Sequence, residues 1–189
     1  MNYLNILFIC LLLVACEQAA NTPAAPQSAT PRTIDWVELI PLGYSPDDIM
    51  AKYQDRLDQF KDDDQQADGV YQQMLDEINN APLNSQIDNQ LIKLPGFVAP
   101  LVYQAGKISE FLFVPYFGAC IHVPPPPINQ IIWVKTATGQ EIDEKQAYFP
   151  FWVSGKIRIQ GQKTEIGEAG YRILDAITEL YEYKEEPNL

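Results

Sequence analysis

The sequence predicts an α+β domain that is mainly β: a small five-stranded antiparallel barrel of the OB type (oligonucleotide/oligosaccharide-binding), preceded by two amphipathic helices. Two successive patterns along the chain lead to this prediction. Apolar residues recur at helical spacing up to Pro82, and from Leu91 they occur in short strand-like runs separated by turns. The 189 residues, 47% apolar and 20% charged, suit one globular domain. A β-sandwich is the alternative architecture.

Residues 1–15 have the features of a lipoprotein signal peptide. The stretch from Leu4 to Ala15 is almost entirely apolar, but it is too short to span a bilayer. It leads into the motif LVAC at Cys16, which matches the lipobox of bacterial lipoproteins, where cleavage precedes a cysteine that carries a diacylglycerol. We therefore expect a lipid on Cys16, with an ordinary cleaved signal as the alternative. The residue after it is Glu17 and not Asp, which favours the outer membrane over the inner one.

Residues 16–32 have the composition of a flexible linker. They are rich in Ala, Pro, Ser, Thr and Gln and contain no aromatic residue, so they cannot bury enough apolar surface to fold. This segment would tether a periplasmic domain to the membrane. The globular domain is expected over residues 33–189, with a helical part at 45–81 and a β part at 91–183.

A short strand or extended lead-in is predicted at residues 33–41, and a helix start follows it. Ser45 can cap a helix, Pro46 suits its first position, and Asp47 and Asp48 complement its positive end. The spacing then predicts two helices, or one kinked helix, with a solvated acidic outer surface. We expect the apolar faces to pack against the β part through Tyr53, Leu57, Val70, Tyr71, Met74 and Ile78.

The β part contains five runs of strand type, separated by glycines and by a run of prolines. They cover residues 92–102, 108–116, 130–135, 149–159 and 171–183. The last run also fits a helix, because Ile173, Leu174, Ile177 and Leu180 recur at helical spacing. We interpret it as a strand.

Charge and composition exclude several classes of function. A formal net charge of −12 and a pI near 4.4 have the wrong sign for binding nucleic acid. Three cysteines cannot form a disulfide framework, and one histidine cannot build a multi-histidine metal site. The chain contains no phosphate-binding glycine loop, G-x-S-x-G elbow or H-E-x-x-H motif.

Cys120 and His122 form the chemically suggestive pair of the sequence. Residues two apart on a strand face the same side, so the thiol and the imidazole would project together. Their Cβ atoms, about 7 Å apart, suit a shared zinc or copper ion better than a thiolate–imidazole bond. Glu110 is the nearest further ligand along the sequence. The alternative is structural, with a buried thiol and a hydrogen-bonded histidine.

Two other features could serve binding. Pro124, Pro125, Pro126 and Pro127 lack backbone donors and favour the polyproline II conformation, either as a partner-docking surface or as a rigid connector. Six aromatic side chains could line a ligand groove, although such residues more often form a core. They are Tyr116, Phe117, Trp133, Phe149, Phe151 and Trp152.

Several motifs together resemble a bacterial family known as domain of unknown function 3299. They are Asp35-Trp36, residues 38–41, the LPGFV run at 94–98, the FGACIHVPPPP run at 117–127, residues 152–155 and residues 167–172. The resemblance covers residues 34–183. It implies an envelope protein, either secreted or lipid-anchored, with partners among transporter components of the envelope, and it implies no reaction.

These observations lead to three hypotheses of function. The first is a non-catalytic accessory or binding lipoprotein of an envelope transport or homeostasis system, acting around residues 117–127. The second is a metal- or redox-responsive binding protein that uses Cys120 and His122. The third is a hydrolase whose residues the sequence does not reveal.

The lipobox predicts that the mature protein begins at Cys16 with an acylated N-terminus. The variant Cys16→Ser should persist as an uncleaved precursor without lipid, because its hydroxyl cannot replace the thiol that accepts the diacylglycerol. Mass spectrometry of the mature N-terminus measures both properties. An unacylated terminus at any other residue would contradict the prediction.

The metal hypothesis predicts stoichiometric zinc or copper that is lost in both Cys120→Ser and His122→Ala. Binding should weaken as the pH falls through the titration range of histidine, because the metal requires a thiolate and a neutral imidazole. Elemental analysis of protein purified without chelator or affinity histidines provides the measurement. Protein without metal would leave the structural interpretation of the pair.

Overall fold

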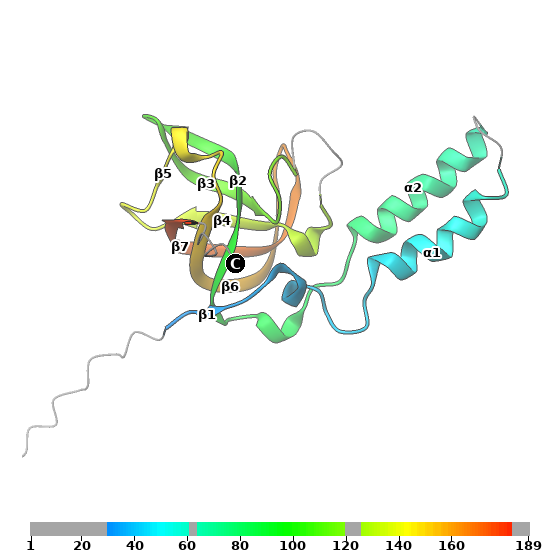
Figure 1. Ribbon diagram of the computed structural model, residues 1–189, viewed down its shortest axis with the longest axis horizontal. Coiled ribbons are helices and arrows are strands. Elements are labelled where there is room, and N and C mark those ends of the chain that lie inside the picture. Colours follow the sequence, from blue (N-terminus) through cyan, green and yellow to red (C-terminus); the bar gives the residue numbers. More distant parts are fainter. Residues whose placement is uncertain (1–29, 61–63, 120–125, 183–189) are drawn as a thin grey trace, which may run out of the picture.

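A computed structural model describes residues 30–60, 64–119 and 126–182 of the chain (Figure 1). Its two α-helices and seven strands confirm the mainly β composition. The α-helices are α1 (Pro46–Leu57) and α2 (Gln65–Asn79). The strands are β1 (Arg32–Thr33), β2 (Leu91–Gln104), β3 (Lys107–Val114), β4 (Ile132–Thr136), β5 (Ile142–Asp143), β6 (Phe151–Lys163) and β7 (Glu168–Leu180). Short 3₁₀ helices are η1 (Trp36–Leu39), η2 (Ser85–Ile87), η3 (Ile128–Gln130) and η4 (Glu144–Gln146).

All five predicted strands are present, including the ambiguous last one, which is β7. A short strand or extended lead-in was expected at residues 33–41. The strand there, β1, covers only Arg32–Thr33, and η1 follows it. The sequence left open two helices or one kinked helix, and the structure has two separate helices. None of the helices in the described part of the chain is long and apolar enough to cross a membrane.

Five strands pair in a ring in the order β2, β6, β7, β4, β3 and back to β2. Four of these pairings are antiparallel, but β4 and β7 are parallel, with Ile132 opposite Tyr171. The expectation of an entirely antiparallel arrangement is therefore wrong at this pair. The reason is geometric, because a closed ring with an odd number of strands cannot alternate direction throughout.

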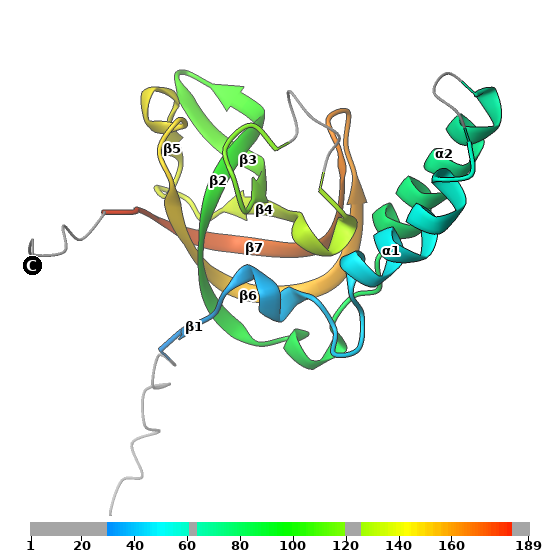
Figure 2. The same cartoon turned by 45° about the vertical axis from the view of Figure 1, so that its right-hand side comes forward.

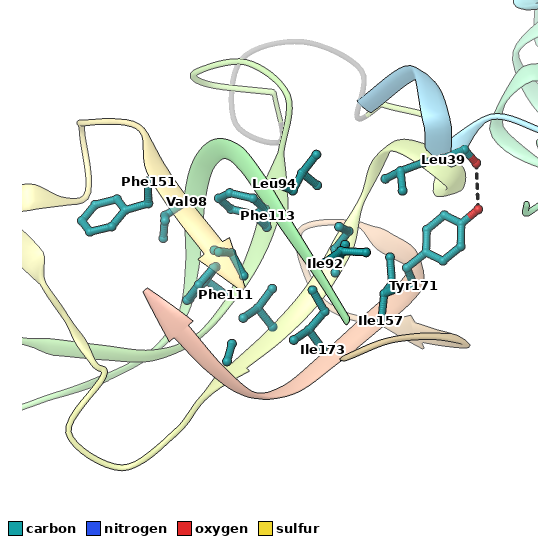
Figure 3. Packing of buried hydrophobic residues seen from close by; sticks show 14 of the residues in the cluster. Leu39, Ile92, Leu94, Val98, Phe111, Phe113, Phe151, Ile157, Tyr171 and Ile173 are labelled. Atoms are coloured by element: carbon teal, nitrogen blue, oxygen red, sulfur yellow. Dashed lines mark hydrogen bonds between the residues drawn. The ribbon is translucent and has the colours of Figure 1, made fainter. Parts of the chain in front are cut away.

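The core of the protein lies inside this ring. Side chains alternate along β2 and β3, so Leu94 and Val98 point inward, as do Phe111 and Phe113 (Figure 3). Strands β6 and β7 contribute buried isoleucines from the other side. A smaller cluster on the outer side of β2 and β3 contains Ala99, Leu112, Val114, Ala119, Ile131 and Ala169. Parts of these strands are thus covered on both faces.

The helices form a hairpin that projects away from the ring (Figures 1 and 2). Ser45 caps α1 by accepting a hydrogen bond from the Asp48 backbone N–H at 3.2 Å, as its sequence predicts. The apolar stripes of the two helices pack on each other and bury Ile49, Tyr53, Val70 and Met74. The expectation that these stripes pack on the β part is therefore wrong. Each stripe is narrow, and the neighbouring helix already covers it.

One buried tyrosine holds the base of this hairpin to the ring. The Tyr171 hydroxyl on β7 donates to the Leu39 carbonyl at 2.8 Å (Figure 3). It accepts from the Asn84 N–H at 2.6 Å. The Asn84 side chain in turn donates to the Glu38 carbonyl at 2.8 Å. Leu39 precedes the helices and Asn84 follows them, so these bonds fix both ends of the hairpin. Burial raises the pKa of Tyr171 to about 12.

Tyr171→Phe should lower the free energy of unfolding by about 1–3 kcal/mol, because it leaves a partly buried N–H and a buried carbonyl without their partner. The wild type should also lose stability as the pH rises from about 10 to about 12, since the unfolded chain releases the phenol proton first. Denaturant unfolding of both proteins over this pH range measures these effects. Tyr148→Phe, which alters an exposed ring, is the control. An equal pH dependence in Tyr171→Phe would contradict the assignment.

Candidate functional site

Most of the site residues predicted from the sequence lie outside the described residues. These are Cys16, Cys120, His122, Pro124 and Pro125. Glu110, the suggested further ligand, forms a salt bridge with Lys135 at 2.8 Å. Within the described residues, no group of three His, Cys, Asp or Glu side chains could hold a metal ion.

Two prolines of the predicted docking run are described. Pro126 is buried and Pro127 is half-buried, where it directly precedes η3. Pro126 lines a shallow depression of about 200 Å³ beside Asn79, Asn80 and Glu168. This end of the run therefore lies near the end of α2 and the start of β7.

A larger groove lies beside the hairpin of β2 and β3. The turn of this hairpin contains Ala105 and Gly106 with φ angles of 52° and 75°. Positive φ at both central residues is typical of a type I′ turn, whose twist suits paired strands. Tyr103 lies just before the turn, at the tip of the hairpin.

Strand β5 and helix η4 form the opposite side of the groove. Asp143 pairs with Lys107 across the strands, and the Glu144 N–H donates to the Gly106 carbonyl at 3.0 Å. The Asp143 carboxylate caps η4 by accepting from the Lys145 N–H at 3.0 Å. This hydrogen bond, assisted by Lys107, lowers the pKa of Asp143. Backbone pairing and a cap therefore fix η4 beside the hairpin.

The groove encloses about 420 Å³ and is mainly apolar and aromatic. Three of its rings are strongly exposed: Tyr103 at 57%, Phe117 at 57% and Tyr148 at 70%. Its charged lining residues are Glu144 and Lys145, which have opposite sign. The complete lining is Val98, Pro100, Tyr103, Phe117, Glu144, Lys145, Ala147 and Tyr148.

Ring contacts extend the groove into a second depression. Phe117 lies between Tyr148 and Phe97, with ring centroids 6.2 Å and 6.0 Å away. Phe97 also lines the second depression, of about 240 Å³, together with Trp36, Pro95, Gly96, Pro115, Pro150 and Tyr181. Partial burial, reinforced by Tyr148 and Glu144, raises the pKa of Tyr103. The combined surface offers aromatic rings and prolines with little net charge.

The six aromatic residues considered from the sequence divide between core and surface. Phe151 is buried in the core of the ring, whereas Trp133 and Trp152 are half-buried. Tyr116, Phe117 and Phe149 are exposed. Of the six, only Phe117 lines the larger groove.

Sequence reasoning missed Tyr103 and Tyr148 as site residues. The signal for Tyr103 was the Ala105-Gly106 turn, which places it at a hairpin tip. No local pattern marks Tyr148, because the pairing of β5 with β3 brings it to the groove. The pairing joins residues far apart in the sequence.

Comparison with known proteins supports the resemblance noted in the sequence. Residues 36–179 match the family model of DUF3299, described as a protein of unknown function. The crystal structure of a DUF3299 family protein from Pseudomonas aeruginosa PAO1 is similar, with 37% sequence identity and a TM-score of 0.61. That similarity covers 83% of this chain and 100% of the other. No curated protein matches the chain. The chain belongs to the DUF3299 family.

Proposed function

We propose that this DUF3299 protein is a non-catalytic, lipid-anchored binding protein of the bacterial envelope, favoured at the outer membrane. It would serve a transport or homeostasis system by binding an extended, proline-containing segment of a partner protein. The observation that carries this proposal is the groove between the β2–β3 hairpin and η4, which presents three exposed aromatic rings.

The chemistry of the groove suits this ligand. Aromatic-lined grooves bind proline-rich segments in the polyproline II conformation, which loses little conformational entropy on binding. Tyr103, Phe117 and Tyr148 can pack against proline rings, and the two tyrosines can donate hydrogen bonds to ligand carbonyls. Glu144 and Lys145 offset each other, so the groove does not select strongly for charged ligands.

The position of the groove connects it to residues 117–127. Phe117 begins this segment and lines the groove, so a partner in the groove also meets the start of the segment. The proposal therefore keeps the sequence-based expectation of partner contacts at residues 117–127 and adds a described surface beside them.

We also propose that the ring of strands is an OB-like barrel. Its support is the closed pairing order and the buried side chains that fill the inside. OB folds bind ligands near the loop between their first two strands. Here that loop is the Ala105-Gly106 turn beside the groove. An experimental structure in which β4 and β7 are unpaired would contradict the closed barrel.

The peptide hypothesis predicts that Phe117→Ala and Tyr148→Ala each weaken binding of proline-containing peptides by about tenfold, because each removes an exposed ring from the groove. The probe is an array of short peptides with and without a Pro-x-x-Pro core, followed by calorimetry on the strongest binder. Tyr71→Ala, which removes an exposed tyrosine from α2, is the matched control. An array without enrichment for proline, or an equal loss in Tyr71→Ala, would contradict the proposal.

A further inference from the structure

A basic cavity lies on the outer face of β6 and β7, away from the aromatic groove. The strand register places Arg158 directly opposite Arg172, and Trp133 on β4 is opposite Arg172 on the other side. Ile157 and Ile173, which adjoin the arginines in the sequence, are fully buried in the core. Because side chains alternate across a strand, both arginines point outward. The three strands thus present one row of Trp, Arg and Arg.

The positive charge of this row is only partly neutralised. The Arg158 Nε atom lies 3.5 Å from a carboxylate oxygen of Asp88. Arg172 and the neighbouring Lys156 form no salt bridge with any other residue in the described segments. Like charges directly opposite on paired strands destabilise a sheet. An anion between the two guanidinium groups would relieve this repulsion.

Arg172 is held in position for such an anion. Its guanidinium carbon lies 5.6 Å from the centroid of the Trp133 ring, within the range of a cation–π interaction. Stacking leaves the N–H groups at the edge of the guanidinium plane open to a ligand. Arginine presents these donors as a rigid fork that matches two oxygens of a phosphate.

The cavity around these side chains encloses about 340 Å³. Its lining is Lys156, Arg158, Gln160, Arg172, Leu174 and Asp175. Asp175 is the acidic residue in this set, and Asp88 lies beside Arg158, so three cations are accompanied by two carboxylates. This local excess of positive charge contrasts with the net charge of −12 of the whole chain. An anion at this place would therefore be attracted by the local cations and not by the charge of the whole protein.

We infer that this cavity binds a phosphate group and that the group belongs to the headgroup of an anionic membrane phospholipid. The choice of a lipid rests on the proposed lipid anchor, whereas the phosphate site does not. Strand β1 begins at Arg32, where the predicted linker ends. It pairs with β2, and β2 pairs with β6, so the linker meets the ring two strands, or about 10 Å, from β6.

The test uses the full-length lipidated protein in micelles of dodecyl maltoside, a detergent without phosphorus. Inorganic phosphate is added in one series and short-chain phosphatidylglycerol in the other. The readouts are the NMR signals of the Trp133 indole N–H and of the Arg158 and Arg172 side-chain N–H groups. We expect saturable shifts with phosphatidylglycerol, and affinities about tenfold lower in Arg158→Gln and Arg172→Gln.

Arg56→Gln is the matched control, because Arg56 also stacks on an aromatic ring, 5.1 Å from the Tyr53 centroid, but lies on α1. Lys156→Gln is a further variant of the same cavity, because it removes a lining cation that forms no described salt bridge. Equal response to inorganic phosphate would support the phosphate site and overturn the lipid headgroup as its source. No saturable shift with either probe, or an equal loss in Arg56→Gln, would overturn the site itself. Neither result depends on the aromatic groove or on its peptide.

Discussion

The hydrogen bonds of the Tyr171 hydroxyl are the contact on which the arrangement of the two parts depends. The helical hairpin is inserted between η1 and η2, so its two ends must return to one place on the ring. Tyr171 bonds to the backbone of Leu39 on one side and of Asn84 on the other. Further bonds support the same place, because Asn129 donates to the Pro82 carbonyl and Gln130 to the Trp36 carbonyl. Forming these hydrogen bonds costs the Tyr171 side chain little conformational entropy, since its ring is already packed in the core.

With both ends of the hairpin fixed in this way, α1 and α2 pack on each other and do not cover the ring. Their shared core of Ile49, Tyr53, Val70 and Met74 is separate from the core of the strands. Parts of the outer surface of the ring stay exposed as a result, and they carry two chemically different depressions. The aromatic groove lies at the tip of the β2–β3 hairpin, and the basic cavity lies on β6 and β7. A peptide and a phosphate group could therefore be bound at the same time.

The sequence predicted the local structure well, because strands and helices depend on periodicity and caps. Ser45 and Pro46 marked the start of α1, and alternation from Leu91 marked the strands. The predictions that failed concern contacts between elements far apart in the sequence. Periodicity shows that a helix has an apolar stripe, but it does not show whether a helix or a sheet covers that stripe. The opposition of Arg158 and Arg172 was missed for the same reason, since strand register is a property of the pairing and not of either strand.

The opposed arginines also clarify how stability and binding are divided in this ring. On the inner side, the same strand pair places Ile157 opposite Ile173, where apolar burial stabilises the pairing. One residue further along, the outer side places two cations opposite each other, which opposes the pairing. Gly155 makes room for the buried Ile173 side chain, because a Cβ at this position would lie 2.3 Å from it. The core thus stabilises a register that places two arginines opposite each other on the outer side, and an anion is the ligand that this register favours.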